Sequence, residues 1–263
     1  MRTAPAAAPR PTPTMASTLR ALLTDPRDRL FVFVYEEALA PPDGGGDAAD
    51  TAETIRLLGR LSEVGGNAVV VLSDRSLDAV DRSLAPLRLP GCGQSGLEIR
   101  GPGGDVVRSR VVADLDPVRR RMQARCDAGL DIVDEGLAIG LHHGGDPELE
   151  IRARELARSA VALAPAFYRV RFDRDVTRVT FAGASKGRAL AQIMCCDRFI
   201  ERIPLVFCGR SIDDVGAAAR SFGGNVISVG ECAGDDGDVS LPGINDVRWL
   251  IRDFLADLSA RSG

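Results

Sequence analysis

Residues 30–35 read LFVFVY, and no charged residue interrupts this apolar run. Such a run is typical of a strand buried on both faces of a parallel sheet, whereas a half-exposed strand alternates apolar and polar residues. Residues 41–50 follow as a loop rich in Pro, Gly and Asp. Residues 51–64 then have helical spacing, with Ile55 and Leu61 on one side. This stretch therefore predicts a buried strand followed by a covering helix.

The same order of strand and helix recurs along the chain. Residues 68–72 (AVVVL) form a second apolar run, and a helix is expected to begin at residues 73–76. Towards the C-terminus, residues 203–208 (IPLVFC) and 225–229 (NVISV) are apolar runs separated by a helical pattern over residues 212–221. Alternating strands and helices predict a doubly wound α/β domain, with its ligand site at the carboxyl ends of the strands.

The middle of the chain has a different pattern. Residues 168–172 (YRVRF) alternate apolar and polar side chains, which indicates an antiparallel sheet with one wet face. We therefore predict an α+β cap domain, residues 107–181, inserted between two parts of the α/β core, residues 29–106 and 182–263. The elements expected in the cap are helices over residues 117–126 and 147–163 and strands over residues 130–133, 137–142, 167–172 and 176–181.

Composition and charge exclude several classes of protein. The 263 residues are 45% hydrophobic and 27% charged, as in soluble globular proteins. No apolar run approaches the roughly 20 residues of a membrane span. A net charge of -4 argues against nucleic acid or an acidic membrane as the main partner. Residues 1–16 are rich in Ala and Pro and are predicted to be a disordered leader, with Met15 as an alternative start.

Cysteine usage predicts a cytoplasmic protein. The six cysteines show no C-x-x-C spacing, and the adjacent Cys195 and Cys196 cannot readily pair with each other. No secretory signal precedes them. A reducing cytosol fits this pattern best.

The basic residues are distributed in an unusual way, because Lys186 is the only lysine and all other basic residues except the two histidines are arginines. Lys186 lies in residues 184–188 (ASKGR), directly before an apolar helical run. A compact ammonium is not equivalent to the planar guanidinium of arginine when it meets a phosphoryl oxygen. Lys186 is therefore either a cation for an anionic ligand or a lysine that survived compositional drift by chance.

Five motifs follow one another along the chain, namely VLSDRS at 71–76, GQSGLEIR at 93–100, DEGLAIGLH at 134–142, SKG at 185–187 and VFCG at 206–209. Over about residues 29–258, this ordered set resembles the trehalose-6-phosphate phosphatases of the haloacid-dehalogenase-like superfamily. The resemblance implies a haloacid-dehalogenase-like α/β core with a cap. It assigns phosphate binding to Ser73 and Lys186, and substrate binding to Arg75, Glu98 and His142.

The catalytic positions depart from the family's pattern. The resemblance implies an Asp nucleophile at the end of the first strand, an acid/base Asp two residues later, and Mg²⁺ held by carboxylates. Aligned on Leu39, Ala40 and Pro41, these two positions are Val34 and Glu36. Valine has no group that can attack phosphorus. The family has two metal-binding acids directly after the glycine of VFCG, and this chain has Arg210 and Ser211 in their place. Two acids, Asp213 and Asp214, follow shortly afterwards and are weaker candidates for a metal.

Further departures affect substrate recognition. Ser95 stands where the family has His, Gly144 where the cap has Arg, and Arg178 where a cap Glu is expected.

Several of these residues also have a purely structural interpretation. Ser73 is either a phosphate contact or the N-cap of the following helix. Arg75 is either a salt-bridge partner or a ligand contact, and Glu98 points either into the cleft or to the surface. His142 and His143 are adjacent on a strand and face opposite sides, which disfavours a shared metal. Acids at the start of a helix, such as Asp213 and Asp214, favour the helix dipole without any metal.

We therefore predict a catalytically inactive homologue that needs no Mg²⁺ and binds a sugar phosphate or a protein of trehalose metabolism. The alternatives are an active or altered Mg²⁺-dependent phosphatase, and a structural interaction module without a ligand. Glu36 and Arg210 are expected to pair at the former metal position, with Ser73 and Lys186 lining the same cleft. Such a pair would neutralise the carboxylate without a metal.

Overall fold

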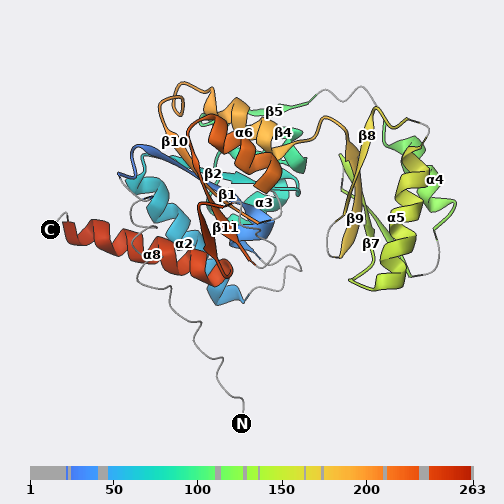
Figure 1. The fold of residues 1–263 in the computed structure, drawn as a ribbon, viewed down its shortest axis with the longest axis horizontal. Helices are drawn as coiled ribbons and strands as arrows, with labels where there is room; N and C mark the ends of the chain where they lie inside the picture. Colours follow the sequence, from blue (N-terminus) through green and yellow to red (C-terminus); the bar gives the residue numbers. More distant parts are fainter. Residues whose placement is uncertain are drawn as a thin grey trace, which may run out of the picture.

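The computed structural model describes residues 22, 25–40, 47–109, 114–126, 129–135, 137–162, 164–172, 175–209, 212–230 and 237–261 of the chain. Its elements form two groups that lie side by side in Figure 1, a larger one built on a mixed sheet and a smaller one built on an antiparallel sheet. The predicted leader and Met15 lie outside the described residues.

The larger group is an eight-stranded sheet within the described residues, in the order β12-β11-β10-β1-β2-β3-β4-β5. Neighbours from β12 to β3 run parallel, and β4 and β5 complete the sheet as an antiparallel edge. The strands are β1 (Arg29–Val34), β2 (Val69–Leu72), β3 (Gly91–Gly93), β4 (Glu98–Arg100), β5 (Val106–Arg108), β10 (Ile203–Cys208), β11 (Asn225–Val229) and β12 (Val239–Leu241).

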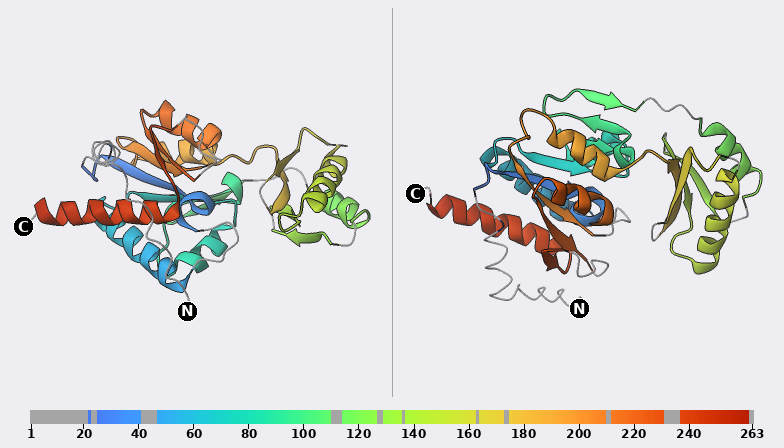
Figure 2. Two further views of the ribbon diagram at one scale, coloured as in Figure 1. Left: turned by 60° about the horizontal axis from the view of Figure 1, so that its bottom comes forward. Right: turned by 45° about the horizontal axis from the view of Figure 1, so that its top comes forward.

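The apolar run at β1 supplies both faces of this sheet. Phe31 and Phe33 pack in one hydrophobic cluster with α2 (Ala48–Val64), α3 (Leu77–Leu84) and α8 (Ile244–Arg261). Leu30, Val32 and Val34 pack in a second cluster with α6 (Lys186–Met194) and α7 (Ala217–Ser221) on the opposite face. Figure 2 shows these helices on the two faces of the sheet. This two-sided burial confirms the predicted doubly wound arrangement.

The smaller group is a four-stranded antiparallel sheet within the described residues, in the order β6-β7-β9-β8. Helices α4 and α5 cover one face of it, on the side turned away from the larger group in Figure 1. The elements are α4 (Asp116–Gln123), β6 (Asp131–Asp134), β7 (Ala138–His142), α5 (Pro147–Val161), β8 (Tyr168–Phe172) and β9 (Val176–Phe181).

Two predicted boundaries need correction. The predicted start of the cap at Val107 falls inside β5, because residues 101–105 close a hairpin with Gly101 N–H donating to Asp105 O at 3.1 Å. The chain therefore leaves the larger sheet only after Arg108. The helix predicted over residues 212–221 begins as a π-helical turn, η3 (Ile212–Gly216), and becomes α-helical only in α7.

No helix among the described residues has the length and apolar content needed to cross a membrane.

Candidate functional site

The carboxyl ends of β1 and β2 bring distant polar residues together. Val34 lies opposite Leu72 in the parallel register, so the residues that follow the two strands emerge at the same edge of the sheet. Glu36 lies in the π-helical turn η1 (Tyr35–Leu39), and Ser73 and Asp74 follow β2 directly. The start of α6 and the turn after β3 complete the site. We call its five residues the Asp74 cluster, namely Glu36, Ser73, Asp74, Ser95 and Lys186.

Asp74 is the centre of this cluster. Lys186 Nζ donates to Asp74 Oδ2 at 2.9 Å, and Ser95 Oγ donates to Asp74 Oδ1 at 2.5 Å. Arg171, on β8, places its guanidinium 3.9 Å from the same carboxylate. Lys186 is only 1% exposed. The sole lysine of the chain is therefore a buried cation whose partner is a carboxylate 112 residues earlier.

Glu36 is hydrogen-bonded to Ser73, the other residue predicted to bind phosphate. Its Oε1 accepts hydrogen bonds from Ser73 Oγ and from Asp74 N–H, the latter at 3.1 Å. Ser73 is fully buried, and its Oγ also accepts from Arg75 N–H at 2.9 Å. The second oxygen of Glu36, Oε2, is buried without a hydrogen-bond partner among the described residues. The predicted partner Arg210 lies outside the described residues.

The charges of the cluster balance internally. Burial disfavours ionisation of Asp74, but Lys186, the Ser95 hydrogen bond and Arg171 together hold the pKa of Asp74 well below its usual range. Burial would lower the pKa of Lys186, but Asp74, Glu36 and Glu37 hold it above its ordinary value. Burial, followed by the charge of Asp74, raises the pKa of Glu36. Asp74 is thus the ionised carboxylate that Lys186 and Arg171 both face, while ionisation is disfavoured at Glu36.

A strained turn places Ser95 over Asp74. Gln94 and Ser95 have φ values of 52° and 54°, in the left-handed region that non-glycine residues seldom adopt. The turn is fixed by Ser95 N–H donating to Ser73 O at 3.0 Å and by Gln94 N–H donating to Arg75 O at 2.7 Å. A Cβ at Gly96 would come 2.3 Å from Ser185 O, so only glycine lets this turn approach the start of α6.

The same turn joins the two sheets. Gln94 Nε2 donates to Glu135 O, and Leu137 N–H donates to Gln94 Oε1 at 3.2 Å. Arg171, on β8, also reaches across, with its guanidinium 3.9 Å from Asp74 Oδ1. The antiparallel sheet is therefore bonded to the core beside the Asp74 cluster.

The donor set does not fit the Mg²⁺ ion that the fold family implies. Val34, at the nucleophile position, is fully buried, and its side chain has no oxygen. Asp214 accepts from Ser185 Oγ at 2.8 Å and from Gly187 N–H at 3.1 Å, so its carboxylate serves the start of α6, while Asp213 is exposed. The described part of the chain contains no group of three or more His, Cys, Asp or Glu that could hold a metal. Arg210 and Ser211 lie outside that part. A Mg²⁺ ion needs several oxygen ligands in near-octahedral geometry.

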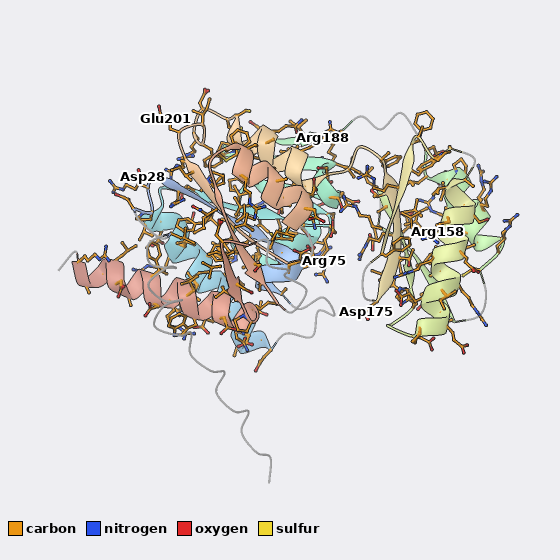
Figure 3. All side chains as sticks on the ribbon, in the orientation of Figure 1. Asp28, Arg75, Arg158, Asp175, Arg188 and Glu201 are labelled. Carbon is orange, nitrogen blue, oxygen red and sulfur yellow. The ribbon has the colours of Figure 1, made fainter. Side chains whose placement is uncertain are left out.

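The three predicted substrate-binding residues are not gathered at the cluster. Arg75 is exposed, with its guanidinium 5.7 Å from the centre of the Tyr35 ring, and lies on the side of the core turned towards the smaller sheet (Figure 3). His142 lies on β7 with Nε2 4.0 Å from Glu135 Oε1, and burial lowers the pKa of His142. The neighbouring His143 follows the end of β7 and is buried, whereas His142 is partly exposed.

Hydrogen bonds decide between the alternative interpretations of Ser73 and Glu98. The N-cap of α3 is Ser76, whose side chain accepts from Ala79 N–H, so Ser73 does not have that role. Glu98 is buried, and its Oε2 accepts from Leu77 N–H at 2.8 Å in the first turn of α3. Its Oε1 accepts from Arg108 at 3.1 Å. Both oxygens of Glu98 are therefore used within the core rather than offered to a sugar.

We predict that Glu98→Ala lowers the free energy of unfolding by about 1–3 kcal/mol, because it leaves the buried Leu77 amide without an acceptor. Glu98→Gln keeps an acceptor and should lose less. Urea unfolding of both variants measures the difference. Equal stability of Glu98→Ala and the native chain would show that the carboxylate has no structural role.

Sequence reasoning missed Asp74, Arg171 and Gln94. The one available signal was at position 74, where the motif reads Ser-Asp-Arg-Ser and the resembling family has Ser-Gly-Arg-Ser. A carboxylate here replaces a glycine directly after Ser73, one of the two positions that the resemblance assigns to phosphate.

Comparisons with known proteins agree with the resemblance that the sequence motifs indicate. The chain is 27% identical over 157 residues to a probable trehalose-phosphate phosphatase of Sinorhizobium fredii, a match that covers 56% of this chain and only 59% of that protein. It is 27% identical over 199 residues to the trehalose-6-phosphate phosphatase of Escherichia coli, covering 72% of this chain and 73% of that protein. No protein-family model matches the chain.

Solved structures show the same fold at low sequence identity. The C-terminal domain of Candida albicans trehalose-6-phosphate phosphatase superposes with a TM-score of 0.76 at 15% identity, covering 94% of this chain and 98% of that one. A haloacid-dehalogenase-like hydrolase from Bacteroides thetaiotaomicron gives a TM-score of 0.60 at 14% identity, covering 86% and 98%. The chain thus resembles the trehalose-6-phosphate phosphatases in sequence and has the haloacid-dehalogenase-like fold.

Proposed function

We propose that this chain is a trehalose-6-phosphate phosphatase homologue that does not hydrolyse phosphate esters and acts by binding. One observation carries the proposal. The two residues that the resemblance assigns to phosphate, Ser73 and Lys186, are buried and bonded to the chain's own carboxylates, Glu36 and Asp74. Asp74 thus takes the place of a phosphoryl group as the anion at Lys186.

A substrate phosphate would have to displace Asp74 before it could reach Lys186. The phosphate would gain only the difference between its own interaction with the Lys186 ammonium and the interaction that Asp74 already makes, so the existing ion pair weakens phosphate binding at this position. Hydrolysis of a bound ester is disfavoured further, because Val34 cannot attack phosphorus. In other enzymes, loss of the catalytic nucleophile lowers the rate about 10⁶-fold. Haloacid-dehalogenase-like phosphatases generally use Mg²⁺, whereas the internal charge balance of the Asp74 cluster removes the need for a cation here.

The candidate binding partners are a sugar phosphate or a protein of trehalose metabolism, in the cytoplasm. The negative net charge supports a small-molecule or protein partner over nucleic acid. Five cysteines in the described part of the chain are free thiols, which supports a reducing compartment.

Phosphate release from trehalose 6-phosphate, with and without Mg²⁺, tests the proposal. We expect no Mg²⁺-dependent release above background, while the Escherichia coli relative under the same conditions serves as the positive control. Turnover of about 1 s⁻¹ or more, an ordinary enzyme rate, would overturn the proposal in favour of an altered Mg²⁺-dependent phosphatase.

A further inference from the structure

One carboxylate connects the two groups of elements. Asp74 follows β2 in the larger group, and its two oxygens face cations that belong to different groups. The Lys186 ammonium, at the start of α6 in the larger group, donates to Asp74 Oδ2 at 2.9 Å. The Arg171 guanidinium, on β8 in the smaller group, lies 3.9 Å from Asp74 Oδ1. The charge of Asp74 therefore joins the smaller group to the larger one.

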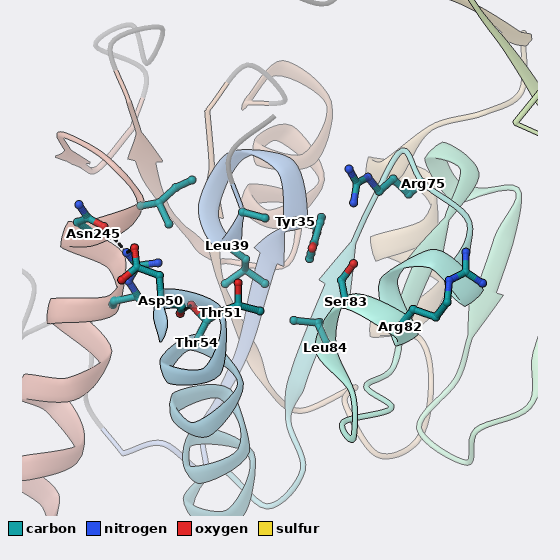
Figure 4. A pocket seen from close by; sticks show the side chains of 13 residues that line it. Tyr35, Leu39, Asp50, Thr51, Thr54, Arg75, Arg82, Ser83, Leu84 and Asn245 are labelled. Atoms are coloured by element: carbon teal, nitrogen blue, oxygen red, sulfur yellow. Dashed lines mark hydrogen bonds and ion pairs between the residues drawn. The ribbon is translucent and has the colours of Figure 1, made fainter. Parts of the chain in front are cut away.

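The cation from the smaller group is held in place by the backbone. Arg171 Nη2 donates to Ala184 O at 3.1 Å, which fixes the guanidinium beside Asp74. Arg75, the next residue after Asp74, has a different neighbour. Its guanidinium lies 5.7 Å from the centre of the Tyr35 ring, and its side chain lines a pocket that none of the five cluster residues lines (Figure 4). Arg171 is thus the arginine that faces the Asp74 carboxylate.

Asp74 also supports the turn that makes the second contact between the groups. Ser95 Oγ donates to Asp74 Oδ1 at 2.5 Å, and Ser95 has a φ value of 54°. A non-glycine residue in this left-handed region costs free energy, so the bond to Asp74 helps to maintain the turn. The neighbouring Gln94 uses both ends of its amide on the smaller group, at Glu135 O and Leu137 N–H. The Gln94 contact is therefore tied to Asp74 as well.

Three residues of this contact are departures from the resembling family. Asp74 stands where that family has Gly, Ser95 where it has His, and Arg178 where it has Glu. Arg178 Nε donates to both oxygens of Glu135 at 3.0 and 3.1 Å, and the carbonyl of Glu135 accepts from Gln94. Substitutions at three separate places in the sequence therefore meet where the two groups touch.

We propose that Asp74 is an internal latch that holds the smaller group against the larger one without any ligand. The chain itself supplies the anion between a cation of each group, Lys186 and Arg171. Loss of the latch should let the smaller group move away from the larger one while each sheet stays folded. The proposal concerns the position of the smaller group and does not depend on whether the chain hydrolyses phosphate.

Hydrogen–deuterium exchange, read at single amides by NMR, tests the latch, because the Leu137 N–H reports on the Gln94 contact. Arg171→Gln removes the cation of the smaller group and leaves the ion pair inside the larger group in place. It should raise the exchange rate at Leu137 about two- to fivefold, as expected for the loss of a partly exposed ion pair. Arg169→Gln is the matched control, since Arg169 is an exposed arginine on the same strand. It should exchange as the native chain does.

Asp74→Asn removes the charge that both cations face and should raise the exchange rate at Leu137 about tenfold or more, as expected for the loss of a charge-assisted hydrogen bond. Amides of β1 and β9 lie inside the two sheets and report on unfolding of each group. Their exchange should rise less than that of Leu137.

Two outcomes would overturn the latch. One is that Arg171→Gln and Arg169→Gln give the same exchange rate at Leu137. The other is that the amides of β1 and β9 accelerate as much as Leu137 in Asp74→Asn, which would show a loss of overall stability without release of the smaller group. Phosphate release from trehalose 6-phosphate is a separate readout that bears on the proposed function alone, so the two proposals can fail independently.

Discussion

Alanine at position 74 should lower the free energy of unfolding by about 3–5 kcal/mol, because it leaves the buried Lys186 ammonium without its ionised partner. The other nearby carboxylate, Glu36, is held towards its neutral form and already accepts from Ser73 and the Asp74 amide. Burial, the largest cause that raises the pKa of Glu36, persists in Asp74→Ala, so Glu36 is a weaker partner for the ammonium than Asp74 is. Lys186 is 1% exposed, so water cannot solvate the ammonium unless the cluster opens.

Urea unfolding measures this effect, with Asp105→Ala as the control. Asp105 is an exposed acid in the hairpin turn between β4 and β5, and its loss should change stability by no more than about 0.5 kcal/mol. A loss in Asp74→Ala as small as that in Asp105→Ala would show that the pair at Lys186 contributes little.

The same interaction has a pH signature. The pKa of Asp74 is lower in the folded chain than the unfolded value of about 3.9, so its ionisation stabilises the fold above that pH and the contribution is lost as the pH falls towards the folded value. The stability difference between the native chain and Asp74→Asn should therefore be greatest above about pH 4 and should shrink below it. A difference that grows with acidification would contradict the assigned ionisation.

Aspartate at position 34 should destabilise the chain by about 3 kcal/mol or more and should not create a phosphatase. Val34 is fully buried in the cluster that includes Leu72 and Cys208, so a carboxylate there is removed from water and placed among apolar side chains. Lys186 cannot compensate it while Asp74 holds that cation. Positions 210 and 211 remain Arg and Ser, which supply no carboxylate for Mg²⁺.

Val34→Asn is the matched variant, because asparagine has the shape of aspartate without the charge. The additional loss in Val34→Asp over Val34→Asn isolates the cost of the buried charge, and both are measured by urea unfolding. Phosphate release from trehalose 6-phosphate is measured on the same samples. Mg²⁺-dependent turnover by Val34→Asp would show that the missing nucleophile alone had silenced the site.

The fold could be predicted from the sequence because its signals are local. The apolar run at β1 serves two hydrophobic clusters, and the alternation at β8 marks an antiparallel sheet. Both patterns depend on neighbouring residues. The start of the cap at Val107 was misplaced because the short strand β5 (Val106–Arg108) has no long apolar run that marks it in the sequence.

The candidate site could be predicted only in part. Resemblance identified Ser73 and Lys186 as residues that converge, and the structure brings them into one cluster with Glu36. It could not show that Asp74 bonds Lys186, because that contact joins residues far apart in sequence and depends on the orientation of two side chains. The role of Glu98 could not be predicted for the same reason, since Glu98 lies in β4 and its partner Leu77 lies in α3.

The burial of Lys186 also determines which chemistry the surface of this protein can undergo. Lys186 is the only lysine, and in the folded chain its ε-amine is enclosed by the core. Enzymes that acetylate, methylate or ubiquitinate lysine therefore find no accessible ε-amine on the native molecule. The same holds for amine-reactive dyes and cross-linkers, whose reaction with the folded chain is confined to the α-amino group. Labelling at Lys186 would consequently report on unfolding of the core.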